Sequence, residues 1–205
     1  MNPFAHYFAK PAVLAALLVG SASATASLTP GAVQVASERN EASRRPCELS
    51  VNARFQEGAP RDYFYITNAS EPKWSISEFN LDLEPSAGRL IFDTHAGGKG
   101  VDVFQLFEVA EGSAEIGSAT LPGDGESQLR IHFLRFDAGD TFSFSIDVDD
   151  QLRDSSLGQI RVAGSEIAGS VLQVQLINEQ GEERTQQLRF NADNTTQIEV
   201  SGCQA

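Results

Sequence analysis

Apolar and polar residues alternate with a period of two through most of this 205-residue chain. In TFSFSIDVD, residues 141–149, every even-numbered residue is apolar and every odd-numbered one is Thr, Ser or Asp. Successive side chains of a β-strand point to opposite faces, so this pattern indicates a strand with one buried face and one solvated face. The other segments that read as strands are 49–55, 63–68, 74–83, 89–94, 128–136, 158–162, 171–177 and 187–190.

Gly-rich turns separate these short strands, and nowhere do apolar residues recur at helical spacing over a dozen positions. The pattern predicts an all-β protein, an antiparallel β-sandwich of the jelly-roll or Greek-key kind, with no significant helix outside the N-terminal leader. An up-and-down barrel is the alternative. Between Glu78 and Phe79 the alternation changes phase, which indicates a β-bulge.

The N-terminus has the organisation of a secretory signal peptide. Lys10 supplies a positive charge, residues 12–20 are apolar, and small residues lead to an A-x-A site that ends at Ala26. We expect residues 1–26 to be the signal peptide, with cleavage after Ala26 and Ala24 as the alternative. The apolar run is too short to span a bilayer, so a secreted or periplasmic protein without membrane insertion is predicted.

The remaining chain fits a single domain. Residues 27–46 are polar and small, which is typical of a flexible lead-in, and residues 47–205 suffice for one core. Cys47 and Cys203 lie at the two ends of this domain. In an oxidising compartment such an isolated pair predicts a disulfide, which would make the first and last strands neighbours.

The chain is strongly acidic, with a formal net charge of −13. This charge argues against nucleic acid and anionic lipid as partners. A cation-binding surface fits it, and so does a surface that is simply well solvated.

One Gly-rich stretch of the sequence resembles a known Ca²⁺-binding repeat. Residues 97–105, GGKGVDVFQ, match the nonapeptide by which β-roll proteins bind Ca²⁺. A roll needs about three stacked repeats, and the sequence contains one. We therefore expect residues 97–100 to form a hairpin loop between strand 89–94 and a strand that begins at Val101, with Asp93 and Asp102 flanking the turn.

Further acids could complete a Ca²⁺ site. Asp147 and Asp149 are two residues apart on a predicted strand and so share a face, and Glu166 has small neighbours that allow close backbone approach. Ca²⁺ takes about six to eight oxygen ligands, which carboxylates and loop carbonyls supply. The predicted Ca²⁺ ligands are thus Asp93, Asp102, Asp147, Asp149 and Glu166. The alternative is that these acids only cap turns and strand edges.

No catalytic motif is present. The sequence lacks G-x-S-x-G, and His95 and His132 are isolated, so a non-enzymatic role is predicted. Tyr63, Tyr65 and Trp74 could form an aromatic platform for a sugar, although packing in the core explains them as well. A carbohydrate-binding module or a glycan-processing enzyme of the cell envelope is the alternative function.

Several runs, taken in order, resemble the core protein of sponge aggregation factors and its bacterial secreted relatives. The most specific are LIFDT with the Gly-rich loop, FSFSIDVDD and GSEIAG, and the resemblance spans roughly residues 55–177. It implies an exported adhesion domain that binds a cell-surface protein or glycan with the help of Ca²⁺. The acids that match are the five predicted ligands named above.

Overall fold

The computed structural model describes residues 48–58, 61–101, 103–155, 157–192 and 198–199. All of them belong to one compact unit, residues 43–205. The signal peptide, the lead-in, Asp102 and the pairing of Cys47 with Cys203 lie outside the described residues and stay predictions. Within the described ranges, no helix has the length and apolar character needed to cross a membrane.

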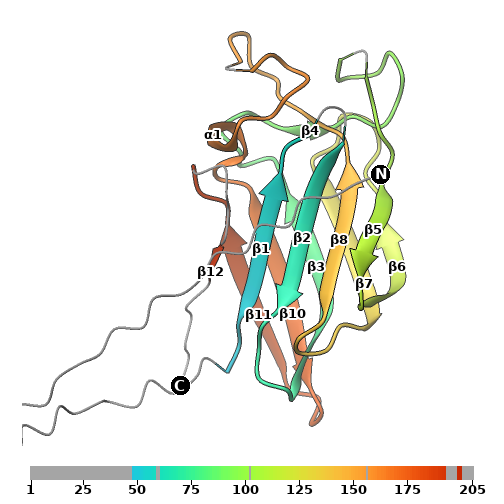
Figure 1. Ribbon diagram of the computed structural model, residues 1–205, viewed down its shortest axis with the longest axis vertical. Coiled ribbons are helices and arrows are strands. Elements are labelled where there is room, and N and C mark those ends of the chain that lie inside the picture. The colour runs from blue at the N-terminus through green and yellow to red at the C-terminus, as the bar shows by residue number, and fades with distance from the viewer. Residues whose placement is uncertain (1–47, 59–60, 102, 156, 193–197, 200–205) are drawn as a thin grey trace, which may run out of the picture. The chain divides into compact units, whose positions relative to one another are not determined.

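Two five-stranded antiparallel sheets pack face to face (Figure 1). The first has the order β12 (Ile198–Glu199), β1 (Val51–Gln56), β2 (Asp62–Asn68), β8 (Thr141–Ile146) and β5 (Glu108–Gly112). The second has the order β11 (Glu183–Arg189), β10 (Val171–Asn178), β3 (Trp74–Asp82), β7 (Gln128–Arg135) and β6 (Glu115–Thr120). A small third sheet pairs β4 (Ile91–Phe92) with β9 (Val148–Asp149), and one short helix, α1 (Gly164–Ile167), precedes β10. The predicted all-β antiparallel sandwich is confirmed. The strands form two packed sheets and not the single closed sheet of the alternative, a barrel.

Phe144, in β8, lies at the centre of the core. Its ring centroid is 5.0 Å from that of Phe64 in the same sheet and 5.9 Å from that of Phe79 in the opposite sheet. Phe107 and Phe142 also contact it, at 5.3 and 5.8 Å. The apolar half of the period-two pattern therefore forms the layer between the sheets, where it removes aromatic surface from water.

The other face of β8 is not the solvated face that the alternation predicts. Ser143 is 5% exposed and Ser145 is 1% exposed. The Ser143 hydroxyl accepts a hydrogen bond from Glu111 N and donates one to Glu111 O, and Ser145 Oγ accepts from Gln105 Nε2 over 2.8 Å. Strand β5 and the segment before it satisfy the serine hydroxyls, so small polar residues fit this buried face.

The predicted bulge lies in β3. Glu78 pairs with Gln175 of β10, whereas Ile76 pairs with Leu176, so Ser77 is the extra residue. Ser77 and Glu78 are both partly exposed, and the next residue returns to the core. The change of phase in the sequence thus marks a real insertion in the ladder.

Two local predictions are wrong. Strand β4 pairs with β9, through Phe92 and Val148, and not with residues 101–107 as a hairpin. Phe92 and Val148 are fully buried, so core packing favours this long-range pairing. Residues 158–162 form a turn in which Arg161 N donates to Gly158 O, instead of a strand.

Candidate metal centre

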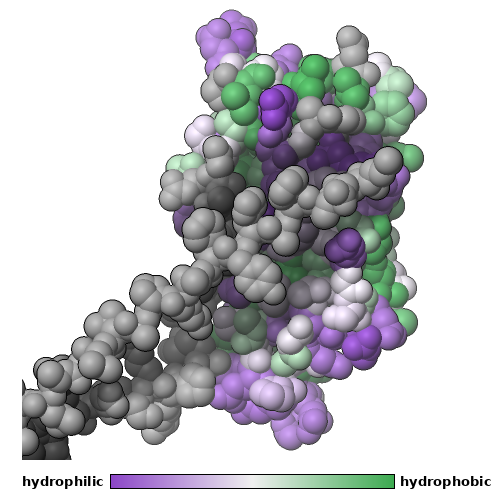
Figure 2. Space-filling view, in the orientation of Figure 1, coloured by the Kyte–Doolittle hydropathy of each residue, from purple (hydrophilic) through white to green (hydrophobic). Residues whose placement is uncertain are grey.

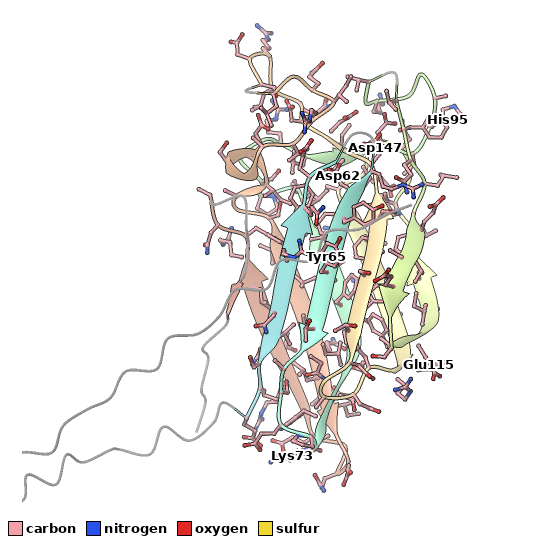
Figure 3. The ribbon with its side chains drawn as sticks, in the orientation of Figure 1. Asp62, Tyr65, Lys73, His95, Glu115 and Asp147 are labelled. Atoms are coloured by element: carbon pink, nitrogen blue, oxygen red, sulfur yellow. The ribbon has the colours of Figure 1, made fainter. Side chains whose placement is uncertain are left out.

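Five aspartates lie at one end of the sandwich, where β8 passes into β9. Asp147 is the residue between these strands, and Asp149 and Asp150 follow it. The pairing of β4 with β9 brings Asp93 beside them, and Asp93 N donates to Asp147 O over 3.1 Å. Strand β2 begins at the same end, where Figure 3 shows Asp62 near Asp147.

All five side chains are removed from solvent. Asp62, Asp93 and Asp150 are 0% exposed, and Asp147 and Asp149 are 1% exposed. No Lys, Arg or His side chain in the described part of the chain forms an ion pair with any of them. Buried carboxylates are costly unless protons, hydrogen bonds or a cation compensate their charge, so this cluster requires compensation.

Five oxygens of this cluster have no hydrogen-bond partner among the described residues. They are Asp93 Oδ2, Asp147 Oδ1 and Oδ2, Asp149 Oδ1 and Asp150 Oδ2. The second oxygens of Asp93, Asp149 and Asp150 each accept one backbone N–H, at 3.3, 2.8 and 2.9 Å. Since the great majority of buried polar atoms in proteins are paired, these oxygens fit a bound cation or protons that the carboxyl groups share, as in the side-chain hydrogen bond between Asp93 and Asp149.

The Gly-rich loop closes over these carboxylates. A Cβ atom on Gly100 would collide with carboxylate oxygens of both Asp93 and Asp149, and one on Gly98 would collide with the carboxylate of Asp124. Only glycine lets the backbone approach so closely. The next residue, Val101, donates its N–H to Asp149 Oδ2 over 2.8 Å. The loop that matched the calcium repeat thus contacts predicted ligands, although it is not the predicted hairpin.

Asp124 also holds the Gly-rich loop in place, through hydrogen bonds to the backbone on either side of it. Its two oxygens accept N–H groups of Thr94, at 3.3 Å, and of Lys99, at 2.8 Å. Burial raises the pKa of Asp124, but the backbone hydrogen bonds from Lys99 and Thr94, together with a side-chain hydrogen bond to Asp93, hold that pKa below its usual value. Asp124 therefore stays ionised and positions the loop.

The buried acids resist ionisation. Burial first, and then the charges of Asp149 and Asp93, raise the pKa of Asp147 to about 8. Burial, reinforced by Asp93, raises the pKa of Asp149 to about 6 despite the hydrogen bond from Val101. Burial also raises the pKa of Asp93, and it raises that of Asp62 well above the usual range. At neutral pH, protons and a cation therefore compete for this cluster.

We expect the metal-free chain to lose stability as the pH rises from 5 to 8.5. An unfolded Asp ionises near pH ~3.9, whereas folded Asp147 holds its proton up to about pH 8. Between these values the folded state binds more protons, so the free energy of unfolding falls as the pH rises. Urea unfolding in EGTA at pH 5, 6.5 and 8.5 measures this slope. The slope should flatten in Asp147→Asn, and an equal slope in the two proteins would contradict the prediction.

The donor set of the cluster is all oxygen, which favours Ca²⁺ over metals that prefer nitrogen or sulfur. Among the residues that the structure describes, no group of three or more His, Cys, Asp or Glu side chains is placed so that it could hold a metal ion. Asp102, a predicted ligand on the same loop, is not among those residues. An ion would therefore have to draw the carboxylates together.

The structure brings three of the predicted ligands together, namely Asp93, Asp147 and Asp149. Glu166 has another role: its Oε1 accepts a hydrogen bond from Ser155 Oγ at 3.1 Å, and its Oε2 accepts one from Ala163 N at 2.5 Å. Glu166 thus caps the first turn of α1. Its part in metal binding stays a prediction.

Three further acids of this region, Asp62, Asp124 and Asp150, are not among the predicted ligands. Asp62 is the first residue of β2. Its carboxylate accepts hydrogen bonds from the backbone N–H groups of Gly58 and Val148, each with a length of 3.0 Å. Nothing in the local pattern relates Asp62 to residues 147–149. A usable signal was present only for Asp150, because it adjoins the predicted pair.

The aromatic platform considered for a sugar is not formed. Trp74 is 1% exposed, and its Nε1 donates to Glu48 over 3.2 Å. Tyr63 and Tyr65 stack on each other, but the guanidinium of Arg54 lies 3.8 Å from the Tyr65 ring centroid. Trp74 is therefore a core residue, and one face of Tyr65 is occupied within the protein.

Comparison of the chain with protein-family models, with curated proteins and with solved structures finds no match.

Proposed function

We propose that this chain is an exported, non-enzymatic binding domain of the adhesion type, and that it binds Ca²⁺ at the aspartate cluster. The observation that carries the proposal is the set of five buried carboxylate oxygens without a partner among the described residues. Asp93, Asp147 and Asp149 are the proposed ligands. They supply the hard, charged oxygens that Ca²⁺ prefers, and backbone carbonyls and water would complete its shell.

The contacts of the Gly-rich loop support a link between the ion and partner binding. The loop is held to the cluster at Gly100 and Val101, and Asp147 N donates to Gln105 O over 3.2 Å. Between these attachments lie exposed apolar side chains, Val103 at 38% and Phe104 at 39%. An ion that holds the carboxylates would also fix this segment and the apolar side chains that it presents.

Apolar surface near the cluster supports a binding role. Figure 2 shows hydrophobic residues at the loop end of the domain and along the side of β5. The large exposed apolar side chains there include Phe104, Leu106, Val109, Leu157 and Ile160. The proposed partner of this apolar surface is a cell-surface protein or glycan. This choice follows from the resemblance of the sequence to the sponge aggregation factor core protein.

The test is thermal unfolding of the purified chain with increasing Ca²⁺ after treatment with EGTA. A ligand at about 100 times its Kd stabilises the folded state by about 2.7 kcal/mol, which raises Tm by roughly 5–11 °C for a domain of this size. The Asp147→Asn, Asp149→Asn double variant should lose the rise. As a second readout, beads coated with the wild-type chain should bind the producing cells in Ca²⁺ and release them in EGTA.

The matched control is Glu179→Gln with Glu183→Gln, which removes the same charge from exposed positions at the β10–β11 turn. This variant should keep the full Tm rise. A wild-type Tm that does not respond to millimolar Ca²⁺ would remove the metal from the proposal. Equal bead binding with and without Ca²⁺ would remove the link between the metal and adhesion.

A further inference from the structure

We propose that Gln105 is a positioning residue, which holds the side chains of Phe104 and Leu106 in place for contact with a partner protein. The inference rests on the proposed adhesion function and names the contact residues, the class of partner and the residue that positions them. It follows from the burial of Gln105, from its hydrogen bonds and from the exposure of its two neighbours.

Gln105 is a buried polar residue in the segment just before β5. It is 8% exposed, although glutamine is an ordinary surface residue. Its Nε2 donates a hydrogen bond to Ser145 Oγ over 2.8 Å, and its Oε1 accepts one from Arg61 Nε over 3.1 Å. Its backbone carbonyl accepts a third from Asp147 N over 3.2 Å. These hydrogen bonds fasten Gln105 to β8, to the residue after β8 and to the residue before β2.

The residues on either side of Gln105 are exposed and apolar. Phe104 is 39% exposed and Leu106 is 58% exposed. The next residue, Phe107, is partly buried, and its ring centroid lies 5.3 Å from that of Phe144 in the core. Two exposed apolar side chains therefore lie on a segment that is anchored at Gln105 and Phe107.

The surroundings of these two side chains fit a protein partner. Residues 103–107 carry no charge, in a chain with a formal net charge of −13. Beside them, Arg61 and Glu108 form an ion pair at 3.2 Å, and their side chains are 51% and 56% exposed. An uncharged apolar centre with a charged rim is typical of protein–protein interfaces. Side chains that are already held in place bind more tightly, because less order has to be imposed on binding.

Gln105 acts separately from the proposed ion. The Gly-rich loop is held to the aspartate cluster at Gly100 and Val101, whereas the Gln105 side chain is held by Ser145 and Arg61. Neither of these side-chain hydrogen bonds goes to a proposed Ca²⁺ ligand. Loss of the Gln105 side chain should therefore release Phe104 and Leu106 and leave the ion site intact.

The experiment is limited proteolysis of the purified full chain with chymotrypsin, which cleaves after exposed Phe and Leu, with the fragments identified by mass. In Gln105→Ala we expect cleavage after Phe104 and Leu106 to be at least about tenfold faster than in the wild type, because local opening governs its rate. The Tm rise with Ca²⁺ should remain, and binding of coated beads to the producing cells should weaken about tenfold. Ser145→Ala should act in the same direction, and adding it to Gln105→Ala should have little further effect. Gln173→Ala, at an exposed position of β10, is the matched control and should behave like the wild type.

The outcomes separate this inference from the proposed function. Cleavage of Gln105→Ala at the wild-type rate would overturn the positioning role, and faster cleavage with undiminished cell binding would overturn the contact through Phe104 and Leu106. Digestion of the cell surface with proteinase K should abolish bead binding, and binding that survives it would overturn the protein partner. Wild-type beads that bind no cells would overturn the proposed adhesion together with this contact, whereas the cleavage rates decide the role of Gln105 in either case. If Gln105→Ala does not fold, the cleavage rate and cell binding of Ser145→Ala decide.

Discussion

Replacing Phe144 by alanine is expected to destabilise the folded chain by about 3–5 kcal/mol, the usual loss for truncating a buried Phe. The Phe144 ring is 0% exposed and contacts aromatic rings from both sheets, including Phe64 and Phe79. Its removal leaves a cavity where the two layers meet, and neighbouring rings cannot fill it without leaving their own contacts. Since domains are stable by about 5–15 kcal/mol, much of the total is lost. Urea unfolding monitored by circular dichroism measures the change.

Leu134→Ala is the matched control for this prediction. Leu134 lies in β7 and is 78% exposed, so its truncation should change the free energy of unfolding by no more than about 0.5 kcal/mol. If Phe144→Ala cost no more than Leu134→Ala, the packing of the two sheets around Phe144 would be refuted.

Replacing Gly100 by alanine is expected to lower the affinity for Ca²⁺ at least about tenfold, or ~1.4 kcal/mol. The new Cβ would collide with the carboxylate oxygens of Asp93 and Asp149 and turn them away from the cluster. The atoms that must move are the ends of side chains, so the fold should survive. Calorimetric titration with Ca²⁺ measures the affinity, and thermal unfolding in EGTA measures the stability of the metal-free chain.

Gly123→Ala serves as the control, because the nearest atom to its new Cβ is Glu126 Cδ at 3.4 Å, an ordinary contact. It lies in the neighbouring loop, next to Asp124, and should bind Ca²⁺ like the wild type. Wild-type affinity in Gly100→Ala would show that the close approach of this loop has no part in binding. An equal loss in both variants would indicate a general effect of alanine in these loops.

The edge strands show where a sequence pattern becomes too weak to predict a strand. β5 is exposed at every position, and β6 is exposed at all but one. Neither alternates clearly in sequence, because an edge strand with little buried surface needs no apolar face. Backbone pairing with β8 and β7 forms them, and that pairing depends on strands distant in the chain.

Residue types alone predicted the strands that build the core, because burial of one face of a strand imposes a period of two on the sequence. The same period also indicated a bulge next to Glu78, and the register of β3 with β10 then identifies Ser77 as the extra residue. The sequence also identified Asp93, Asp147 and Asp149 as acids beside strand ends and a Gly-rich loop.

Which acids lie close together depends on strand pairings between distant parts of the chain. Burial of Phe92 and Val148 favours the pairing of β4 with β9, and this pairing places Asp93 next to Asp147. The pairing of β2 with β8 places Asp62 beside Asp147 across 85 residues of chain. The hydrophobic contacts that fix such pairings are non-directional and join residues far apart in the sequence. Local residue patterns therefore do not predict them.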